Sequence, residues 1–132
     1  MQRVGIIDDD NRVRFSVQVL LEVSGFDVET FASAEEFLAS QDFSRFGCLI
    51  VDFRLPGLNG LELLRILKRQ QVLTPTVVSS GFITESEEAD FIAAGASAVL
   101  HKPVEPNQLV GTIKDMLTLG GDLQAPPYSE AG

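Results

Sequence analysis

The stretch that decides the fold is Val4-Gly5-Ile6-Ile7-Asp8-Asp9-Asp10, an apolar run that ends on three aspartates. Three later apolar runs end on polar side chains in the same way: residues 48–51 on Asp52, residues 76–78 on Ser79 and Ser80, and residues 98–101 on Lys102. In an open parallel α/β sheet, the carboxyl ends of the strands lie side by side and form the ligand site. The sequence therefore predicts that these polar side chains converge on one site.

Strand and helix patterns alternate five times along the chain. Strands are predicted at residues 4–8, 27–31, 48–52, 76–80 and 98–100, and helices begin near residues 11, 33, 60, 84 and 106. Ser33 to Glu36 and Thr84 to Glu87 have the pattern of capping boxes, and Gly25 and Gly95 are expected helix ends. The last three strands are almost entirely apolar, which is typical of strands covered on both faces. This alternation predicts a parallel sheet with right-handed crossovers.

The length of 132 residues fits one domain, here residues 1–119, followed by a tail or a linker over residues 120–132 that shows no periodicity. The net charge of −9 argues against nucleic-acid binding by this chain, which would require a basic face. The lone Cys48 cannot form an internal disulfide and suits a reducing cytoplasm. No stretch has the ~18 apolar residues of a membrane span, and no signal peptide precedes the first strand. A cytoplasmic protein without membrane contact is therefore expected.

The aspartates at the end of the first strand predict a cation site. Asp8 and Asp9 lie where the strand turns into a loop, so both side chains can lean into one cleft. Carboxylates ~4 Å apart repel by ~4 kcal/mol at an effective dielectric of ~20, unless a cation lies among them. Hard oxygen ligands suit Mg²⁺, with Mn²⁺ as the alternative. A solvated acidic helix start is the other interpretation, and for Asp10, a good capping residue, it is the favoured one.

Asp52 is the candidate nucleophile, because a carboxylate can attack phosphorus and form an aspartyl-phosphate. The transition state spreads negative charge over the phosphoryl oxygens and needs positive and hydrogen-bonding groups around it. Lys102 and the hydroxyl of Ser80 would supply these groups beside a metal held by Asp9 and Asp52. Taken alone, Asp52 fits a loop acid and Lys102 fits a surface lysine. Their placement at matching strand ends favours a shared site.

With these residues the chain resembles a receiver domain of a two-component response regulator. The matching segments run in order along about residues 3–119: Ile6 to Asp10, Val51 to Gly60, Val78 to Gly81, Gly95-Ala96 and Lys102-Pro103. The loop after Asp52 and the spacing look most like regulators of the nitrogen-fixation and LuxR-output type.

The resemblance implies a flavodoxin-like (βα)5 fold, doubly wound, with helices on both faces of a five-stranded parallel sheet. It implies that Asp52 takes a phosphoryl group from a sensor histidine kinase and that phosphorylation switches output or homodimerisation. Asp8, Asp9, Asp52 and the backbone carbonyl of Arg54 would bind the metal. Ser80 would be the switch hydroxyl and Lys102 the phosphate-binding lysine, with a cis bond to Pro103. A DNA-binding output domain would follow in the full protein.

Four positions depart from the usual family pattern or stand out beside it. Ser80 stands where threonine is commoner, and Val99 stands where many members have a rotating Tyr or Phe. Phe82 and Ile83 are unusual apolar residues after the switch hydroxyl, interpreted as local packing, a partner contact or a lid.

Two other functions compete with the leading one. A small phosphatase with an Asp nucleophile usually needs a second acid two residues after it, where this chain has Arg54. A degenerate receiver that only binds partners would not be expected to keep the acids, the hydroxyl and the lysine together.

Overall fold

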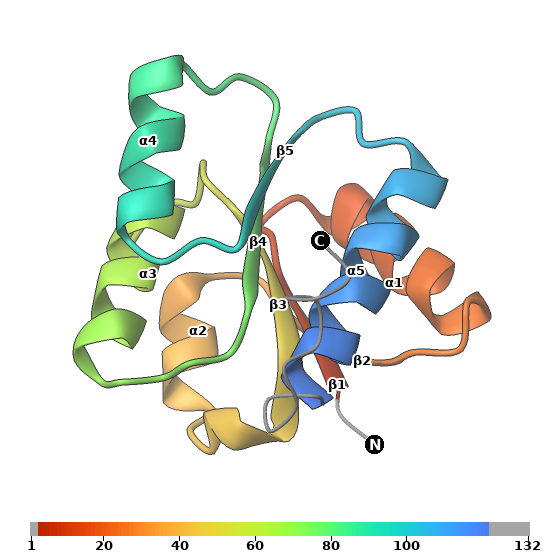
Figure 1. The fold of residues 1–132 in the computed structure, drawn as a ribbon. Helices are drawn as coiled ribbons and strands as arrows, with labels where there is room; N and C mark the ends of the chain where they lie inside the picture. The colour runs from red at the N-terminus through yellow and green to blue at the C-terminus, as the bar shows by residue number, and fades with distance from the viewer. Residues whose placement is uncertain (1–2, 122–132) are drawn as a thin grey trace, which may run out of the picture.

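The computed structural model describes residues 3–121, which form a five-stranded parallel sheet with helices on both faces (Figure 1). The strands are β1 (Arg3–Ile7), β2 (Asp27–Phe31), β3 (Phe46–Asp52), β4 (Thr76–Ser80) and β5 (Ala98–His101), in the order β2-β1-β3-β4-β5. The helices are α1 (Asn11–Val23), α2 (Ala34–Ala39), α3 (Gly60–Arg69), α4 (Glu85–Ala93) and α5 (Pro106–Gly121), with a short 3₁₀ helix η1 (Phe43–Arg45). This strand order is the flavodoxin-like one, so the predicted fold class is confirmed.

The helices divide between the two faces of the sheet. Helices α1 and α5 cover one face, and α2, α3 and α4 cover the other (Figure 1). Side chains alternate along each strand, so Ile6 and Ile50 pack toward α1 and α5, whereas Ile7, Val51 and Val78 pack toward the other helices. The register pairs Ile50 with Val77 and Asp52 with Ser79, which brings the ends of β3 and β4 level.

Local side-chain contacts explain where the helices begin. Asp10 caps α1, because its carboxylate accepts hydrogen bonds from the amides of Arg12 (2.9 Å) and Val13 (3.2 Å). Both halves of the capping box from Thr84 to Glu87 are present at α4. At α2 the prediction is half wrong: Ser33 accepts from the Glu36 amide, but the Glu36 carboxylate accepts from Ala32, one residue before the cap.

Several element boundaries differ from the prediction. Strand β1 runs from Arg3 to Ile7, one residue earlier than predicted at each end. Strand β3 begins at Phe46 rather than Cys48, because the Phe46 ring packs with Phe31 and Phe37 and brings Gly47 into the strand. Strand β5 continues to His101, and α5 runs through Gly120 to Gly121, just past the predicted end. The rest of the predicted tail, residues 122–132, lies outside the described residues. Within residues 3–121, no helix is both long and apolar enough to cross a membrane.

Candidate functional site

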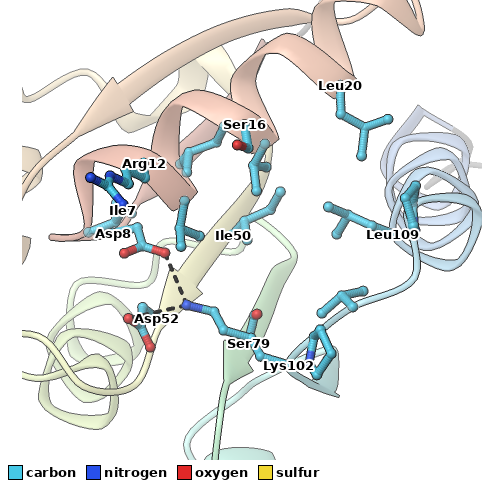
Figure 2. A pocket seen from close by; sticks show the side chains of 16 residues that line it. Ile7, Asp8, Arg12, Ser16, Leu20, Ile50, Asp52, Ser79, Lys102 and Leu109 are labelled. Atoms are coloured by element: carbon cyan, nitrogen blue, oxygen red, sulfur yellow. Dashed lines mark hydrogen bonds and ion pairs between the residues drawn. The ribbon is translucent and has the colours of Figure 1, made fainter.

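Lys102 joins the carboxyl ends of three strands through its ammonium group. Its Nζ lies 3.2 Å from an oxygen of Asp8, after β1, and 3.5 Å from an oxygen of Asp52, the last residue of β3 (Figure 2). Both carboxylates are buried, and the predicted bond between Lys102 and Pro103 is cis. The predicted convergence of acids and lysine at one end of the sheet is therefore confirmed.

Three carboxylates lie close enough to share a cation. Asp8, Asp9 and Asp52 each offer an oxygen within 4.8 Å of the other two, with Asp9 exposed. Oδ1 of Asp8, the oxygen that does not face Lys102, accepts a hydrogen bond from the Asp10 amide at 2.9 Å. This hydrogen bond fixes the Asp8 carboxylate. Asp10 itself points to the start of α1 and stays outside this cluster, as its capping role predicts. Three hard oxygen donors on fixed backbone are a set that Mg²⁺ accepts.

Both oxygens of the Asp52 carboxylate have partners. Oδ1 accepts from the Arg54 amide at 3.2 Å, and Oδ2 faces the Lys102 ammonium. Burial raises the pKa of Asp52 above its usual value, and Lys102 and the Arg54 amide only partly oppose that shift. The carboxylate is thus partly desolvated and held in one orientation, and both properties favour a reacting group over a loop acid.

The two serines at the end of β4 face opposite sides of the sheet. Ser79 pairs with Asp52 across the ladder and lines the same cavity as Asp52 and Lys102. Ser80, the residue singled out from the sequence, is fully buried, and its Oγ has no hydrogen-bond partner within residues 3–121. Ser79 is therefore the hydroxyl beside the acid in this conformation. A buried hydroxyl without a partner is costly, so Ser80 requires a reason to be polar.

The loop between β3 and α3 is fixed against its surroundings at two points. Gly60 lies so close to β3 that an added Cβ would stand 2.8 Å from the Asp52 carbonyl oxygen. Glu35 of α2 accepts from the Leu58 amide at 2.9 Å, and this hydrogen bond lowers the pKa of Glu35. Arg54 and Asp9 line one shallow hollow at the start of this loop.

Sequence reasoning assigned Arg54 only a backbone role and missed its side chain. The guanidinium donates to the carbonyl oxygen of Phe82 at 3.1 Å and lies 3.9 Å from a carboxylate oxygen of Glu87. It also lies 4.4 Å from the centre of the Phe53 ring. Arg54 therefore bridges the loop after β3 to the loop after β4. No local pattern reveals this bridge, because its partners lie about thirty positions further along the chain.

The two apolar residues after Gly81 have different environments. Phe82 is 71% exposed, whereas Ile83 is buried with Phe53 and Phe91 under α4. Val99 is partly buried against the same cluster. Ile83 is thus part of the core, and only Phe82 is free to meet a partner.

A five-stranded parallel α/β domain with paired acids, a lysine and hydroxyls at its strand ends belongs to the class of phosphoacceptor signalling domains. The model of the response regulator receiver domain family matches residues 4–114, and the chain belongs to this family. It is a receiver domain of the two-component type, as its sequence motifs predict.

Curated relatives agree with this assignment. The chain is 36% identical to the transcriptional regulatory protein FixJ of Bradyrhizobium diazoefficiens over 112 residues, which cover 85% of this chain and 55% of FixJ. It is also 36% identical to the response regulator protein TodT of Pseudomonas putida over 127 residues, which cover 95% of this chain and 56% of TodT. The chain therefore spans about half the length of the curated relatives it matches.

Solved structures agree as well. A CheY-like receiver domain protein from Methanospirillum hungatei aligns with a TM-score of 0.85 at 30% identity, over 92% of this chain and 97% of that one. The structure of FixJ-N aligns with a TM-score of 0.82 at 33% identity, over 89% of this chain and 94% of that one.

Proposed function

We propose that Asp52 accepts a phosphoryl group from a sensor histidine kinase and that the modified domain then changes its contacts with partners. The observation that carries this proposal is the position of Lys102 Nζ between the buried carboxylates of Asp8 and Asp52. An ammonium at that point can pair with a phosphoryl group attached to Asp52 and with Asp8 at the same time.

In the transfer, a carboxylate oxygen of Asp52 attacks the phosphorus of the phosphohistidine. The new O–P bond forms as the P–N bond breaks, and the imidazole keeps the bonding electron pair and takes up a proton. Lys102 pairs with negative charge on the phosphoryl oxygens. The Arg54 amide, hydrogen-bonded to Oδ1, leaves Oδ2 as the oxygen nearer the lysine.

Asp8, Asp9, Asp52 and the backbone carbonyl of Arg54 would hold a divalent cation, Mg²⁺ or alternatively Mn²⁺. The carboxylate oxygens within 4.8 Å of one another support this donor set. When bound, the cation offsets the negative charge of the carboxylates and the phosphoryl oxygens.

Ser80 supports a switching role because its buried hydroxyl is unpaired in this conformation. Ser80 faces away from Asp52 in this conformation, so its hydroxyl would reach a phosphoryl oxygen on Asp52 only through a backbone movement at the end of β4. That movement would pull on Gly81 and Phe82. The Arg54 guanidinium donates a hydrogen bond to the Phe82 carbonyl oxygen. A shift of the loop after β4 would therefore either break this hydrogen bond or move the Arg54 side chain with the loop. We propose that the loop and α4 then remodel the face of α4, β5 and α5, through which the domain dimerises.

The identity of Arg54 supports self-dephosphorylation of the domain rather than turnover of a separate substrate. The position two residues after Asp52 holds a guanidinium engaged with Phe82 and Glu87, where a phosphatase would use a second acid. The paired acids and lysine equally disfavour a degenerate receiver.

The charge of the chain, its coverage of its relatives and its cysteine bear on its partners and its location in the cell. The net charge of −9 argues against direct nucleic-acid binding by this chain. Because the match covers only 55% of FixJ and 56% of TodT, a DNA-binding output domain in the full protein is part of the proposal. Cys48 is buried, with its pKa raised to about 12, which suits the reducing cytoplasm expected for this protein.

Labelling of Asp52 tests the proposal. Acetyl phosphate or a phosphorylated kinase should label the wild-type chain when Mg²⁺ is present, and a chelator should prevent it. Asp52→Asn should reduce labelling to background, because an amide is a poor nucleophile. Asp115→Asn, which removes an exposed acid of α5, is the matched control and should label normally. Undiminished labelling of Asp52→Asn would refute the assignment.

A further inference from the structure

The second half of α3 carries three cations without an acidic partner: Arg65, Lys68 and Arg69, here called the α3 cations. All three are exposed, and none forms an ion pair with a carboxylate of residues 3–121. Four of the other Lys and Arg residues do form such pairs: Arg3, Arg45, Arg54 and Lys102. In a chain with a net charge of −9, three neighbouring cations without acids require an explanation.

Helix dipoles explain only part of this cluster. Lys68 and Arg69 lie in the last turn of α3, where cations offset the partial negative charge of the last carbonyl groups. Lys68 Nζ also donates to the carbonyl oxygen of Ala93, the last residue of α4, at 3.0 Å. Arg65 lies one turn earlier and four residues before Arg69, a spacing at which like charges destabilise a helix. The repulsion at Arg65 would be offset by an anionic partner.

The α3 cations line one side of a groove. Helices α3 and α4 lie side by side (Figure 1), and the groove between them has a volume of about 400 Å³. Asp90, Ala93 and Ala94 form its other side, and Asp90 makes no ion pair with the α3 cations. Leu73, in the loop after α3, is 88% exposed and shares the lining of a second hollow with Lys68. The surface therefore presents cations next to one large apolar side chain.

We propose that this groove docks an acidic segment of a partner protein, one that carries several carboxylates and a large apolar side chain. Its carboxylates would meet the guanidinium groups of Arg65 and Arg69, and its apolar side chain would pack on Leu73. Arginine pairs with carboxylates through two parallel hydrogen bonds and is enriched at protein interfaces.

Other anions fit this surface less well. A small inorganic anion would leave Leu73 uncovered. An extended anionic surface such as a membrane would also face the rest of the chain, which is more acidic still without the α3 cations. A short acidic segment meets neither difficulty. Docking here is separate from phosphoryl transfer to Asp52, because none of these residues belongs to the acid cluster.

A labelled peptide tests the chemistry of the partner. By fluorescence anisotropy, fluorescein-labelled EELEELEE should bind the wild-type chain at least about tenfold more tightly than its neutral analogue QQLQQLQQ. Binding should weaken as NaCl rises from ~50 mM to ~500 mM, because exposed charges are screened. The analogue EEAEEAEE should bind less tightly than EELEELEE if an apolar side chain packs on Leu73. Equal affinity for the acidic and the neutral peptide would overturn the proposal.

Single substitutions locate the binding surface. Arg65→Gln and Arg69→Gln should each weaken EELEELEE binding about threefold, as the loss of one exposed charge pair would. Lys114→Gln is the matched control, because it removes one exposed cation from α5, on the other face of the sheet. Asp90→Asn should strengthen binding, because it removes a like charge from the groove. If Lys114→Gln weakens binding as much as Arg69→Gln, the peptide responds only to net charge and the proposal is wrong.

Two further measurements separate this proposal from its alternatives. Vesicles of phosphatidylserine and phosphatidylcholine should bind the wild-type chain no better than vesicles of phosphatidylcholine alone. Binding to the anionic vesicles that Arg69→Gln abolishes would overturn the choice of a protein partner. Acetyl phosphate labelling of Asp52 should be the same in Arg69→Gln as in the wild type, so a failure of docking and a failure of phosphoryl transfer are distinguishable.

Discussion

The two faces of the sheet are packed to different degrees. Under α3 and α4, the rings of Phe53 and Phe91 meet edge to face with centroids 4.8 Å apart, and Ile83 fills the space beside them. Between α1 and α5 a cavity of about 660 Å³ remains. The strand ends divide in the same way, because Asp52 and Ser79 line the cavity while Ser80 is buried on the other side.

Under the proposed function, this difference would separate chemistry from signalling within one small domain. The Asp52 carboxylate, the proposed phosphoacceptor, borders the open side, where a phosphoryl group can be accommodated. The close-packed side would transmit displacement, because a dense core does not absorb small shifts. Ser80, buried beneath the loop that carries Phe82, is the residue at which the two sides meet.

The largest expected effect is on stability and compares the two faces directly. Phe91→Ala should lower the free energy of unfolding by about 3–5 kcal/mol, because it leaves a void in a dense cluster. Leu109→Ala should cost only about 2 kcal/mol, the low end for such a change, because Leu109 already borders empty space. Urea unfolding of both variants measures the difference. Equal losses would show that the cavity side is as tightly packed as the α4 side.

The neighbouring serines sharpen the comparison at the strand end. Ser80→Ala removes a buried hydroxyl without a partner, so the unphosphorylated protein should gain up to about 1–3 kcal/mol while losing its response to beryllofluoride. Ser79→Ala should change stability by less than ~0.5 kcal/mol. Thermal unfolding with and without beryllofluoride checks both. A loss of stability in Ser80→Ala would mean that its hydroxyl already has a partner.

The adjacent acids Asp9 and Asp10 are expected to differ in their contribution to Mg²⁺ binding. Asp9→Asn should weaken Mg²⁺ binding at least about tenfold, because a metal ligand loses its charge. Asp10→Asn exchanges one capping residue for another and should bind Mg²⁺ nearly as the wild type does. Calorimetric titration of Mg²⁺ into each variant decides between them. An equal loss of Mg²⁺ affinity in the two variants would contradict the assignment of Asp9, rather than Asp10, to the metal site.

The sequence predicts the strand ends well because each local pattern agrees with its neighbours. Four apolar runs with polar residues after them are sufficient to place Asp8, Asp52 and Lys102 together in a parallel sheet. The cap at Asp10 and the capping box at Thr84 also depend only on nearby residues.

The features that sequence reasoning missed depend on side-chain direction and distant partners. The face to which Ser79 or Ser80 points depends on the strand register, and a shift of one residue reverses it. The bridge from Arg54 to Phe82 joins two loops that only the folded sheet brings together. The cavity is a property of how far α1 and α5 stand apart, and no residue pattern encodes that distance.

Ionisation of Asp52 should oppose folding in the metal-free protein. Burial raises the pKa of Asp52 in the folded state above 3.8, so the unfolded chain loses this proton at lower pH. Its contribution to stability is complete below pH ~3.8 and is lost as the pH rises through the folded-state pKa. Asp52→Asn should therefore gain stability over the wild type across this range and keep the gain at neutral pH. Chemical unfolding at several pH values without Mg²⁺ measures it, and a difference that shrinks with rising pH would contradict the burial argument.

The smallest expected change in stability concerns Phe82, which lies outside the dense cluster. Phe82→Ala should alter the free energy of unfolding by less than ~0.5 kcal/mol, because the side chain is 71% exposed. It should nevertheless weaken dimerisation in the presence of beryllofluoride roughly fivefold, about 1 kcal/mol, by removing an apolar contact offered by the loop after β4.

Sedimentation velocity with and without beryllofluoride measures this effect, and Asp52 labelling should stay intact. Val23→Ala is the control, because Val23 is 78% exposed on α1, which lies on the other face of the sheet from α4. Equal weakening of dimerisation by both variants would indicate non-specific hydrophobic association rather than a contact at the loop after β4. If the wild-type chain stays monomeric in both states, the exposed Phe82 serves a different protein, and the signal leaves the domain through a hetero-partner.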